Sequence, residues 1–437
     1  MAGRAGEGTN LDSWYGHYAA RTAGLSASEV RALFAVASRP EVVSLAGGMP
    51  FVSALPTELV TGAIDRLLRE RGPVALQYGS GQGAPELREQ ILEVMALEGI
   101  RGTMDDVVVT TGSQHALELL AKLFLDPGDV VLAEGPSYVT ALVVFRSFQA
   151  EVSHVPMDEH GLIPAALRER IASLKAAGKR LKLLYTVPTF NNPAGVTLSW
   201  QRRLEVLEIA RENDILVLED NPYGLLYFDG PPPHAMRSVE KDGVVYLGTF
   251  SKTLAPGFRV GWALAPHGIR EKLILLNEAA VLSPSSFTQL VISEYLSSTD
   301  WKAQINTFRG VYRERRDAML SALAEYLPKL SWTVPNGGFY VWLTLPEQVD
   351  AKSMLPRAVT QLVAYTPGTA FYSDGNGRNN IRLSFCYPTP ELIREGIRRL
   401  ASVISGELEL LDTFSQTGPL STISTESQIT NPPPNLG

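Results

Sequence analysis

Short apolar runs alternate with amphipathic stretches through the middle of the chain, and this alternation limits the possible folds more than any other feature of the sequence. The apolar runs have the length of buried strands and lie at 107–109, 130–132, 181–185, 215–218, 244–247 and 260–263. Helical spacing marks the stretches 85–98, 114–124 and 201–212. Because strands that are apolar on both sides must be covered on both sides, we expect a mainly parallel sheet with helices on both faces.

The pattern changes after Pro266, where the helical stretches become long and the strands few. Expected helices cover 268–282, 287–297, 301–327 and 390–404, and expected strands cover 339–345 and 381–385. We interpret this half as a smaller domain with which a helix near 26–36 packs. The predicted fold class is therefore α/β, with a large, mainly parallel domain flanked by helices and a smaller α+β domain. The predicted division is an N-terminal arm and helix at 1–48, the large domain at 49–290, the small domain at 291–410 and a disordered tail at 411–437.

Composition excludes several classes of function. Lys and Arg number 39 against 46 Asp and Glu, and this net charge of −7 argues against a general nucleic-acid binder. The one cysteine makes no internal disulfide, and the six histidines show no metal-ligand spacing. No apolar run reaches the roughly 18 residues of a membrane helix. We therefore expect a globular, cytoplasmic enzyme without a metal, nucleic acid or membrane partner.

A lysine stands among hydroxyls and an arginine directly after the apolar run 244–247. The polar members of this segment are Thr249, Ser251, Lys252 and Arg259. Ligands bind at the carboxyl ends of strands in open α/β sheets, and hydroxyls with an arginine suit a phosphate monoester. A lysine of lowered pKa in such a place is a candidate Schiff-base amine, although a lone Ser-Lys pair is more typical of a solvated loop.

Two further strand ends carry side chains suited to a pyridine ring. The run 215–218 is followed by Asp220, and a carboxylate there can hold a pyridinium N–H, which makes the ring a better electron sink. Tyr223 and Asn192 come after strand ends and are candidates to reach an oxygen on the ring. Each segment alone is also typical of an ordinary Asn-Pro turn.

The segment after the run 107–109 offers an anion site. Gly112 allows close approach of the backbone, and the helix that begins near Ser113 and Gln114 supplies free N–H groups. Tyr138 follows the next run and either stacks on an aromatic ligand or is an ordinary half-buried side chain.

Together and in this order, these segments resemble the fold-type-I aminotransferases of class I and II, which use pyridoxal 5′-phosphate (PLP). The matching segments are 47–50, 77–79, 113–114, 138, 192–195, 220–223, 251–259 and 380–384. Within that family, 46–50 and 250–254 are similar to the branch of the 2-aminoadipate and aromatic amino acid aminotransferases. The large domain would then be the PLP-binding domain.

The resemblance implies a role for each matching residue. Among the catalytic residues, Lys252 would form the Schiff base and move the substrate proton, Asp220 would pair with the pyridine nitrogen and Tyr138 would stack on the ring. Further cofactor contacts would come from Asn192 and Tyr223 at the ring oxygen, from Ser113, Gln114, Ser251 and Arg259 at the phosphate, and from Tyr78 at the phosphate of a neighbouring subunit. A homodimer with shared active sites is implied.

The substrate would meet Gly48, Asn192 and two arginines. By the resemblance, Arg382 would bind the α-carboxylate, and Arg31 would bind the second carboxylate of a dicarboxylic substrate. Without the resemblance, Arg382 reads as a cross-strand ion-pair residue and Arg31 as a residue of a solvated helix face.

The implied reaction moves an amino group from an L-amino acid to a 2-oxo acid, with 2-oxoglutarate as the acceptor, by a ping-pong mechanism. A PLP-dependent β-lyase or decarboxylase of the same fold is the alternative enzyme. A non-catalytic, aminotransferase-like regulatory domain is the alternative outside enzymes, and the acidic net charge counts against DNA binding.

Overall fold

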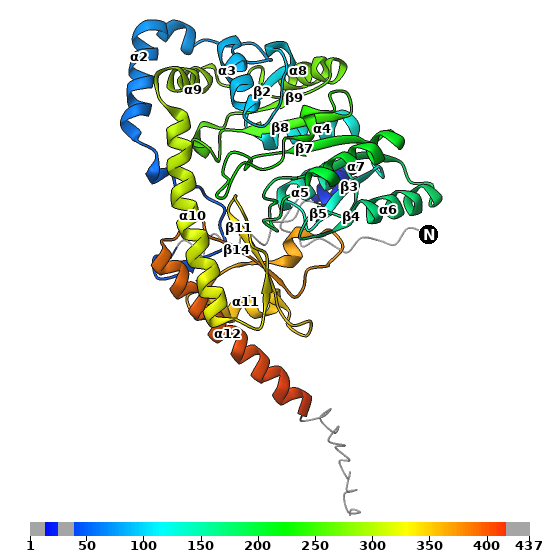
Figure 1. The fold of residues 1–437 in the computed structure, drawn as a ribbon. Coiled ribbons are helices and arrows are strands. Elements are labelled where there is room, and N and C mark those ends of the chain that lie inside the picture. Colours follow the sequence, from blue (N-terminus) through cyan, green and yellow to red (C-terminus); the bar gives the residue numbers. More distant parts are fainter. Residues whose placement is uncertain (1–13, 25–38, 417–437) are drawn as a thin grey trace, which may run out of the picture.

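The computed structural model describes residues 14–24 and 39–416, which form a larger and a smaller domain (Figure 1). The larger domain contains an eight-stranded sheet in the order β2-β9-β8-β7-β6-β3-β4-β5. Its strands are β2 (Val107–Thr110), β3 (Val130–Gly135), β4 (Glu151–Asp158), β5 (Gly161–Leu162), β6 (Leu181–Thr186), β7 (Leu216–Asp220), β8 (Val244–Thr249) and β9 (Gly261–Leu264). Strands β8, β7, β6, β3 and β4 are parallel, whereas β9 is antiparallel to both of its neighbours and β5 is antiparallel to β4. The prediction of a mainly parallel sheet is confirmed.

The strand order reverses beside β3, and this reversal fixes where a ligand can enter. After β3 the chain adds β4 on one side and then β6, β7 and β8 in turn on the other. In open α/β sheets such a reversal leaves a crevice at the carboxyl ends of the two strands concerned, here β3 and β6.

Helices cover both faces of this sheet because successive side chains of a strand point to opposite faces. Val131 and Ala133 of β3 pack with the helices of one face, and Leu132 packs with those of the other. The first face carries α4 (Ser113–Phe124), α5 (Val139–Ser147) and α8 (His267–Val281), and the second carries α6 (Pro164–Ala176) and α7 (Trp200–Glu212). At the β2 edge, α3 (Pro85–Ala96) packs on the buried valines of that strand.

The smaller domain is an antiparallel sheet covered by helices. Its strands, in the order β10-β11-β14-β13, are β10 (Ser331–Trp332), β11 (Tyr340–Thr344), β14 (Asn380–Ser384) and β13 (Thr366–Pro367). Its helices are α10 (Trp301–Tyr326), α11 (Ala351–Thr360) and α12 (Pro390–Gln416), and a short parallel pair joins β1 (Val43–Ser44) to β12 (Val363–Ala364). Helix α10 runs from the larger domain down along the smaller one (Figure 1), and Asp300 caps it by accepting a hydrogen bond from the Ala303 amide at 3.0 Å.

The remaining elements lie mainly in the connections. Two further helices are α2 (Thr57–Ala75) and α9 (Ser286–Ser298), which pack together. The 3₁₀ turns are η1 (Tyr15–His17), η2 (Ala20–Gly24), η3 (Val52–Ala54), η4 (Met104–Asp106), η5 (Met236–Ser238), η6 (Pro256–Phe258) and η7 (Gly368–Phe371).

The sequence pattern does not predict α2, α5, α6, α11, β4 or the two-residue strands. Helix α2 contains Pro73 and a non-helical residue, Arg71, so its sequence does not predict one continuous helix. Helix α6 buries only Leu167 and Ile171, which is too few for a clear helical period. The expected helix near 26–36, with Arg31, lies outside the described residues.

The C-terminal helix is longer than expected, which corrects the predicted start of the tail. Helix α12 continues to Gln416, so residues 411–416 are helical rather than part of a disordered stretch. The helix continues because Leu408 and Leu411 pack against the core and because Glu407 pairs with Arg357 at 2.6 Å. The rest of the predicted tail, 417–437, lies outside the described residues.

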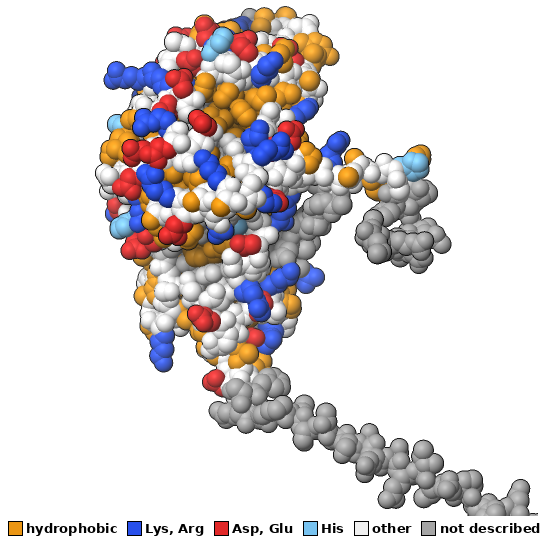
Figure 2. Space-filling model, turned by 90° about the vertical axis from the view of Figure 1, so that its right-hand side faces the viewer, with side chains coloured by type: hydrophobic (Ala, Val, Ile, Leu, Met, Phe, Trp, Pro, Cys, Tyr) orange, Lys and Arg blue, Asp and Glu red, His pale blue; other side chains and the backbone are white. Residues whose placement is uncertain are grey.

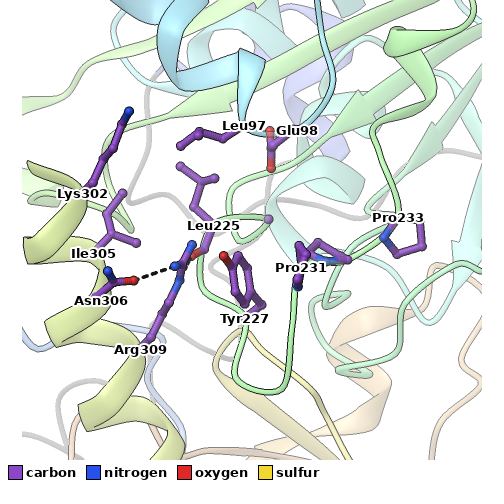
Figure 3. Close-up of a pocket in the computed structure, with 12 residues that line it drawn as sticks. Leu97, Glu98, Leu225, Tyr227, Pro231, Pro233, Lys302, Ile305, Asn306 and Arg309 are labelled. Carbon is purple, nitrogen blue, oxygen red and sulfur yellow. Dashed lines mark hydrogen bonds between the residues drawn. The ribbon is translucent and has the colours of Figure 1, made fainter.

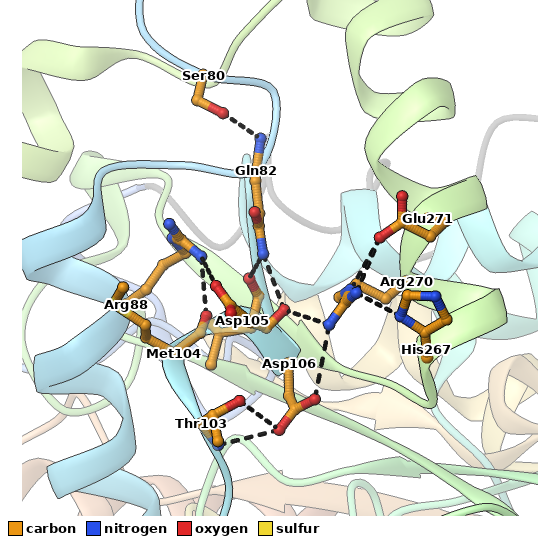
Figure 4. A network of polar contacts seen from close by, with 11 residues as sticks. Ser80, Gln82, Arg88, Thr103, Met104, Asp105, Asp106, His267, Arg270 and Glu271 are labelled. Atoms are coloured by element: carbon orange, nitrogen blue, oxygen red, sulfur yellow. Dashed lines mark hydrogen bonds and ion pairs between the residues drawn. The ribbon is translucent and has the colours of Figure 1, made fainter.

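Polar contacts tie α3 and α8 to the edge of the large sheet (Figure 4). Arg88 of α3 donates to the Met104 carbonyl at 2.9 Å, and Arg270 of α8 donates to the Asp105 carbonyl at 3.0 Å. Because both carbonyls belong to η4, which leads directly into β2, these bonds fix the entry to that strand.

The described surface carries charges of both signs. Figure 2 shows acidic and basic side chains interspersed over the face that it draws. None of the described helices combines the length with the apolar character that crossing a membrane requires. The described residues also contain no cluster of three or more side chains placed to hold a metal ion.

Candidate active site

A pocket of about 300 Å³ opens at the carboxyl ends of the parallel strands, beside the reversal in strand order. Eleven of the thirteen predicted site residues line it: Gly48, Ser113, Gln114, Tyr138, Asn192, Asp220, Tyr223, Ser251, Lys252, Arg259 and Arg382. Tyr78 does not line it and is 78% exposed. Arg31 lies outside the described residues. The segments that the sequence places after different strands therefore meet in one cavity.

Lys252 lies in the interior of this pocket. It follows β8, and its Nζ donates a hydrogen bond to the Gly48 carbonyl at 3.1 Å. Burial lowers the pKa of the Lys252 amine, and the positive charges of Arg382 and Arg259 lower it further. A lowered pKa increases the fraction of neutral amine, which is the nucleophilic form. The environment therefore suits Schiff-base chemistry rather than a solvated cation.

Asp220 is the last residue of β7, and only one of its two carboxylate oxygens accepts a hydrogen bond from the described residues. Tyr185 Oη donates to Asp220 Oδ2 at 2.8 Å, whereas Oδ1 is buried and has no hydrogen-bond partner among the described residues. Burial raises the pKa of Asp220 to about 6, although the Tyr185 hydrogen bond and the nearby Lys252 charge oppose the rise. Because buried polar atoms are nearly always paired, Oδ1 calls for a donor from a ligand, and a ring N–H is such a donor.

The amino end of α4 and Arg259 form a cradle for an anion. Gly112 has a φ of +83°, and a Cβ placed on it would lie 2.5 Å from Arg259 Nη2, so only glycine allows this approach. Arg259 Nη1 lies 3.4 Å from Ser251 Oγ, which in turn accepts from Thr249 Oγ1 at 2.9 Å. The free N–H groups of a helix end, two hydroxyls and a guanidinium are donors that suit a phosphate.

Arg382 lies on β14 of the small domain and reaches the large domain. Its Nη1 donates to Asn192 Oδ1 at 2.9 Å, and its Nη2 donates to the Ala46 carbonyl at 2.6 Å. Its guanidinium lies 4.3 Å from the centre of the Tyr340 ring, and its buried Nε has no partner among the described residues. Trp342 is its cross-strand neighbour on β11, so the ion-pair interpretation of Arg382 is wrong. A buried guanidinium without a carboxylate partner is suited to bind one from a substrate.

Sequence reasoning missed two tyrosines of this site. Tyr340 lines the pocket, and a Cβ placed on Gly48 would lie 1.9 Å from its Oη, so the glycine makes room for this ring. Tyr185 supports Asp220 from the neighbouring strand. Both tyrosines lie in apolar strand segments where an aromatic residue fits the core, so no local signal separates them from packing residues. Only the pairing of β6 with β7 brings Tyr185 to Asp220.

A second cavity, of about 160 Å³, lies between the end of α3, the loop 224–233 and α10 (Figure 3). Arg309 on its wall donates to the Asn306 side chain and to the Leu225 carbonyl, each at 2.7 Å, and lies over the Tyr227 ring. None of the described residues predicted for the site lines this cavity. The first pocket is therefore the candidate active site.

Fold and pocket together define a fold-type-I PLP enzyme. The free Asp220 oxygen, the anion cradle and the half-buried Lys252 fit the ring nitrogen, the phosphate and the aldehyde of that cofactor, and Arg382 on β14 is suited to a carboxylate.

Comparison with known proteins identifies the family. The sequence model of the family described as aminotransferase class I and II matches residues 43–400, and the chain belongs to this family. Aromatic-amino-acid aminotransferase 1 of Thermococcus litoralis is 41% identical over 397 residues, which cover 90% of this chain and 95% of that protein. The 2-aminoadipate transaminase of Thermus thermophilus is 36% identical over 404 residues, 91% of this chain and 99% of that protein.

The solved structures agree with this assignment. The crystal structure of Pyrococcus horikoshii kynurenine aminotransferase in complex with PMP superposes with a TM-score of 0.87 at 39% identity, covering 91% of this chain and 99% of that one. The chain is therefore an aminotransferase that uses pyridoxal phosphate, and the predictions of family, fold class, enzyme class and cofactor are confirmed.

Proposed function

We propose that the protein transfers the amino group of an aromatic or 2-aminoadipate-type L-amino acid to 2-oxoglutarate by a ping-pong mechanism. The names of the relatives from Thermococcus litoralis and Thermus thermophilus support these two classes of donor. The observation that carries the proposal is the meeting of Lys252, the free oxygen of Asp220 and Arg382 in one buried pocket. Transamination requires an amine, a carboxylate that accepts from the N–H of the cofactor ring, and a site for the carboxylate of the substrate.

We assign the cofactor contacts to residues of the large domain. Bound PLP supplies an electron sink for the electrons that remain when the Cα proton of an amino acid is removed. The carboxylate of Asp220 would keep the ring nitrogen protonated, and Tyr138 would stack on the ring. Asn192 and Tyr223 would bind the ring oxygen. The phosphate contacts are Ser113, Gln114, Ser251 and Arg259.

We assign the substrate contacts to the other wall of the pocket. Arg382 binds the α-carboxylate and, with Gly48 and Asn192, orients Cα beside Lys252. The lowered pKa of Lys252 favours its neutral amine, which would act as the base that holds the proton from Cα. Tyr340 and Asp220 are buried, whereas Lys252 is half-buried, so the reacting end of the pocket is only partly exposed to water.

A steady-state test separates this function from the alternatives. The purified holoenzyme is assayed with L-phenylalanine, L-kynurenine and L-2-aminoadipate against 2-oxoglutarate and pyruvate. Parallel lines in double-reciprocal plots, with formation of L-glutamate, support the proposal. Release of ammonia or carbon dioxide instead indicates a β-lyase or a decarboxylase, and no turnover with any donor contradicts the proposal.

We further propose a homodimer with shared active sites, in which Tyr78 contacts the phosphate in the second subunit. Tyr78 is 78% exposed in the single chain, and apolar side chains nearby in sequence, Val74 and Leu76, are also exposed. Exposed apolar groups of this kind mark contact surfaces. Mixing inactive Tyr78→Ala and Lys252→Ala subunits should restore activity if sites are shared, because each hybrid dimer then contains one intact site. A mixture that stays inactive after subunit exchange contradicts shared sites.

A further inference from the structure

A buried carboxylate, Glu134, lies at the end of β3 but does not line the active-site pocket. It is 1% exposed and accepts three hydrogen bonds. Thr186 Oγ1 donates to Oε1 at 2.7 Å, and the Val187 amide and Asn191 Nδ2 donate to Oε2 at 2.9 and 2.8 Å. All three donors belong to the segment that leaves β6. One side chain of β3 therefore holds the start of the neighbouring loop.

This loop carries the residue that orients the substrate arginine. Asn191 is fixed at both ends of its side chain, because its Nδ2 donates to Glu134 and its Oδ1 accepts from the Ala194 amide at 3.0 Å. The next residue, Asn192, accepts from Arg382 Nη1 at 2.9 Å. A short path of contacts thus leads from Glu134 through Asn191 and Asn192 to the guanidinium.

The backbone of Glu134 is tied to the small domain as well. The Ser373 amide donates to His154 Nε2 at 2.9 Å, so Nε2 is an acceptor and Nδ1 carries the proton. His154 Nδ1 therefore donates to the Glu134 carbonyl at 2.8 Å. Because Arg382 and Ser373 both belong to the small domain, the end of β3 meets that domain by two routes, one through the Glu134 side chain and one through its carbonyl.

We propose that Glu134 is a positioning residue for the α-carboxylate site, which acts by holding the 186–192 loop so that Asn192 can orient Arg382. The inference rests on the proposed role of Arg382 in binding the substrate carboxylate. Glu134 itself does not line the pocket, so its effect is on binding geometry rather than on proton transfer.

Two substitutions separate positioning from charge. Glu134→Ala leaves two N–H groups and a hydroxyl buried without an acceptor, which frees the loop. Glu134→Gln keeps the bonds, because its amide oxygen accepts from Val187 and Asn191 while its amide nitrogen donates to Thr186 Oγ1. The glutamine variant should therefore rescue most of the loss that alanine causes.

Asp129 provides a matched control at the opposite end of the same strand. It is fully buried, accepts from the Asp126 amide at 2.9 Å and pairs with Arg180 at 2.9 Å, but it contacts no part of the 186–192 loop. Asp129→Ala should lower the thermal midpoint of unfolding without changing the affinity for a carboxylate.

The experiment measures binding and turnover on the PLP-loaded enzymes. Binding of 3-phenylpropionate, a carboxylate without an amino group, is followed by the change in cofactor absorbance, and single-turnover rates are measured with L-phenylalanine. Glu134→Ala should raise both the Kd of the probe and the half-saturating amino acid concentration by about 10-fold or more. The maximal single-turnover rate should fall less, and the Kd of PLP should rise less than that of the probe, because the phosphate contacts of Ser113, Gln114, Ser251 and Arg259 do not depend on this loop.

A double-mutant cycle with Arg382→Ala tests the route of the effect. If Glu134 acts through Arg382, Glu134→Ala should change the probe Kd much less when Arg382 is already absent. Equal effects in both backgrounds, an unchanged Kd in Glu134→Ala, or the same rise in Kd from Asp129→Ala would each overturn the inference. A different result would contradict the proposed role of Arg382 itself: the wild-type enzyme turns over amino acids, and the Arg382→Ala variant binds the probe as tightly as the wild-type enzyme does.

Discussion

The hydroxyl of Tyr185 donates to Oδ2 of Asp220 at 2.8 Å, and the other oxygen of that carboxylate is buried without a hydrogen-bond partner among the described residues. The two side chains come from neighbouring parallel strands, β6 and β7. The hydrogen bond favours the ionised form of Asp220, whereas burial favours the neutral form and raises its pKa to about 6. A bound pyridinium would add the charge partner that burial makes necessary.

Asp220→Asn should keep the cofactor bound but reduce turnover by about 100-fold or more, because asparagine supplies no negative charge to keep the ring nitrogen protonated. The phosphate contacts with the α4 end and Arg259 are untouched by this change. Cofactor content and single-turnover rate are measured on the same preparation. Near-wild-type turnover would contradict the role of Asp220.

Tyr185→Phe should have a smaller effect of the same kind. Loss of one hydrogen bond to a charged group costs about 1.5–3 kcal/mol, so the single-turnover rate should fall by about 10-fold or more with full cofactor content. The change also raises the pKa of Asp220, because the lost bond stabilised its ionised form. The rate of the variant should therefore depend on pH more steeply below neutrality than that of the wild-type enzyme, and identical pH profiles would contradict this account.

Lys252→Ala should abolish the yellow colour of the purified protein and its turnover. Lys252 lines the pocket, and burial lowers the pKa of its amine. Borohydride reduction of the wild-type holoenzyme followed by peptide mapping should label Lys252. The exposed Lys272→Ala serves as the control and should keep both colour and rate. A label on any other lysine would show the assignment to be wrong.

Much of the site could be predicted because its residues follow strand ends, and strand ends can be read from local apolar runs. Lys252 and Asp220 come just after such runs and Asn192 lies in the loop after another, so a parallel sheet brings them to one edge. The long-range contacts could not be predicted in this way. Tyr185 supports Asp220 only because β6 pairs with β7, and Glu134 reaches Asn191 only because β3 pairs with β6. Helix α12 was placed too short because Leu408 and Leu411 gain their partners from a distant core.

Glu98 should make stability depend on pH. It is buried, accepts from Asn221 Nδ2 at 2.9 Å and also pairs with the Tyr246 hydroxyl, and burial raises its pKa from 4.5 to about 7. Between these values the folded chain holds a proton that the unfolded chain has lost, so this group makes the free energy of unfolding fall as the pH rises from 4.5 to about 7.

Glu98→Gln removes that proton equilibrium and can keep both hydrogen bonds. Relative to the wild-type protein, the variant should gain about 1–3 kcal/mol in the free energy of unfolding between about pH 5 and pH 8. Urea unfolding across this range measures the difference, and Glu169→Gln at an exposed position of α6 is the control. A Glu98→Gln curve parallel to that of the wild-type protein would show that Glu98 does not titrate in this window.

The two arginines predicted for the substrate should differ in which substrates they serve. Every amino or oxo acid presents the same α-carboxylate, so Arg382→Ala should weaken glutamate, 2-aminoadipate and aromatic donors alike. Loss of a charge-assisted contact costs about 1.5–3 kcal/mol, or roughly 10- to 150-fold in kcat/KM. Arg378→Ala is a suitable control, because this exposed arginine pairs with Asp350 away from the pocket.

Arg31→Ala should weaken only the donors with a second carboxylate, by a similar factor, and leave neutral donors nearly unchanged. Single-turnover half-reactions with each donor measure this, because they remove the acceptor from the comparison. Among the described residues the pocket offers no arginine beyond Arg259 and Arg382, which are assigned to the phosphate and the α-carboxylate. A distal carboxylate therefore needs a cation from another part of the chain or from a second subunit. If Arg31→Ala lowers the rates with neutral and dicarboxylic donors by the same factor, Arg31 does not bind the distal carboxylate, and specificity for that group must come from another residue or be absent.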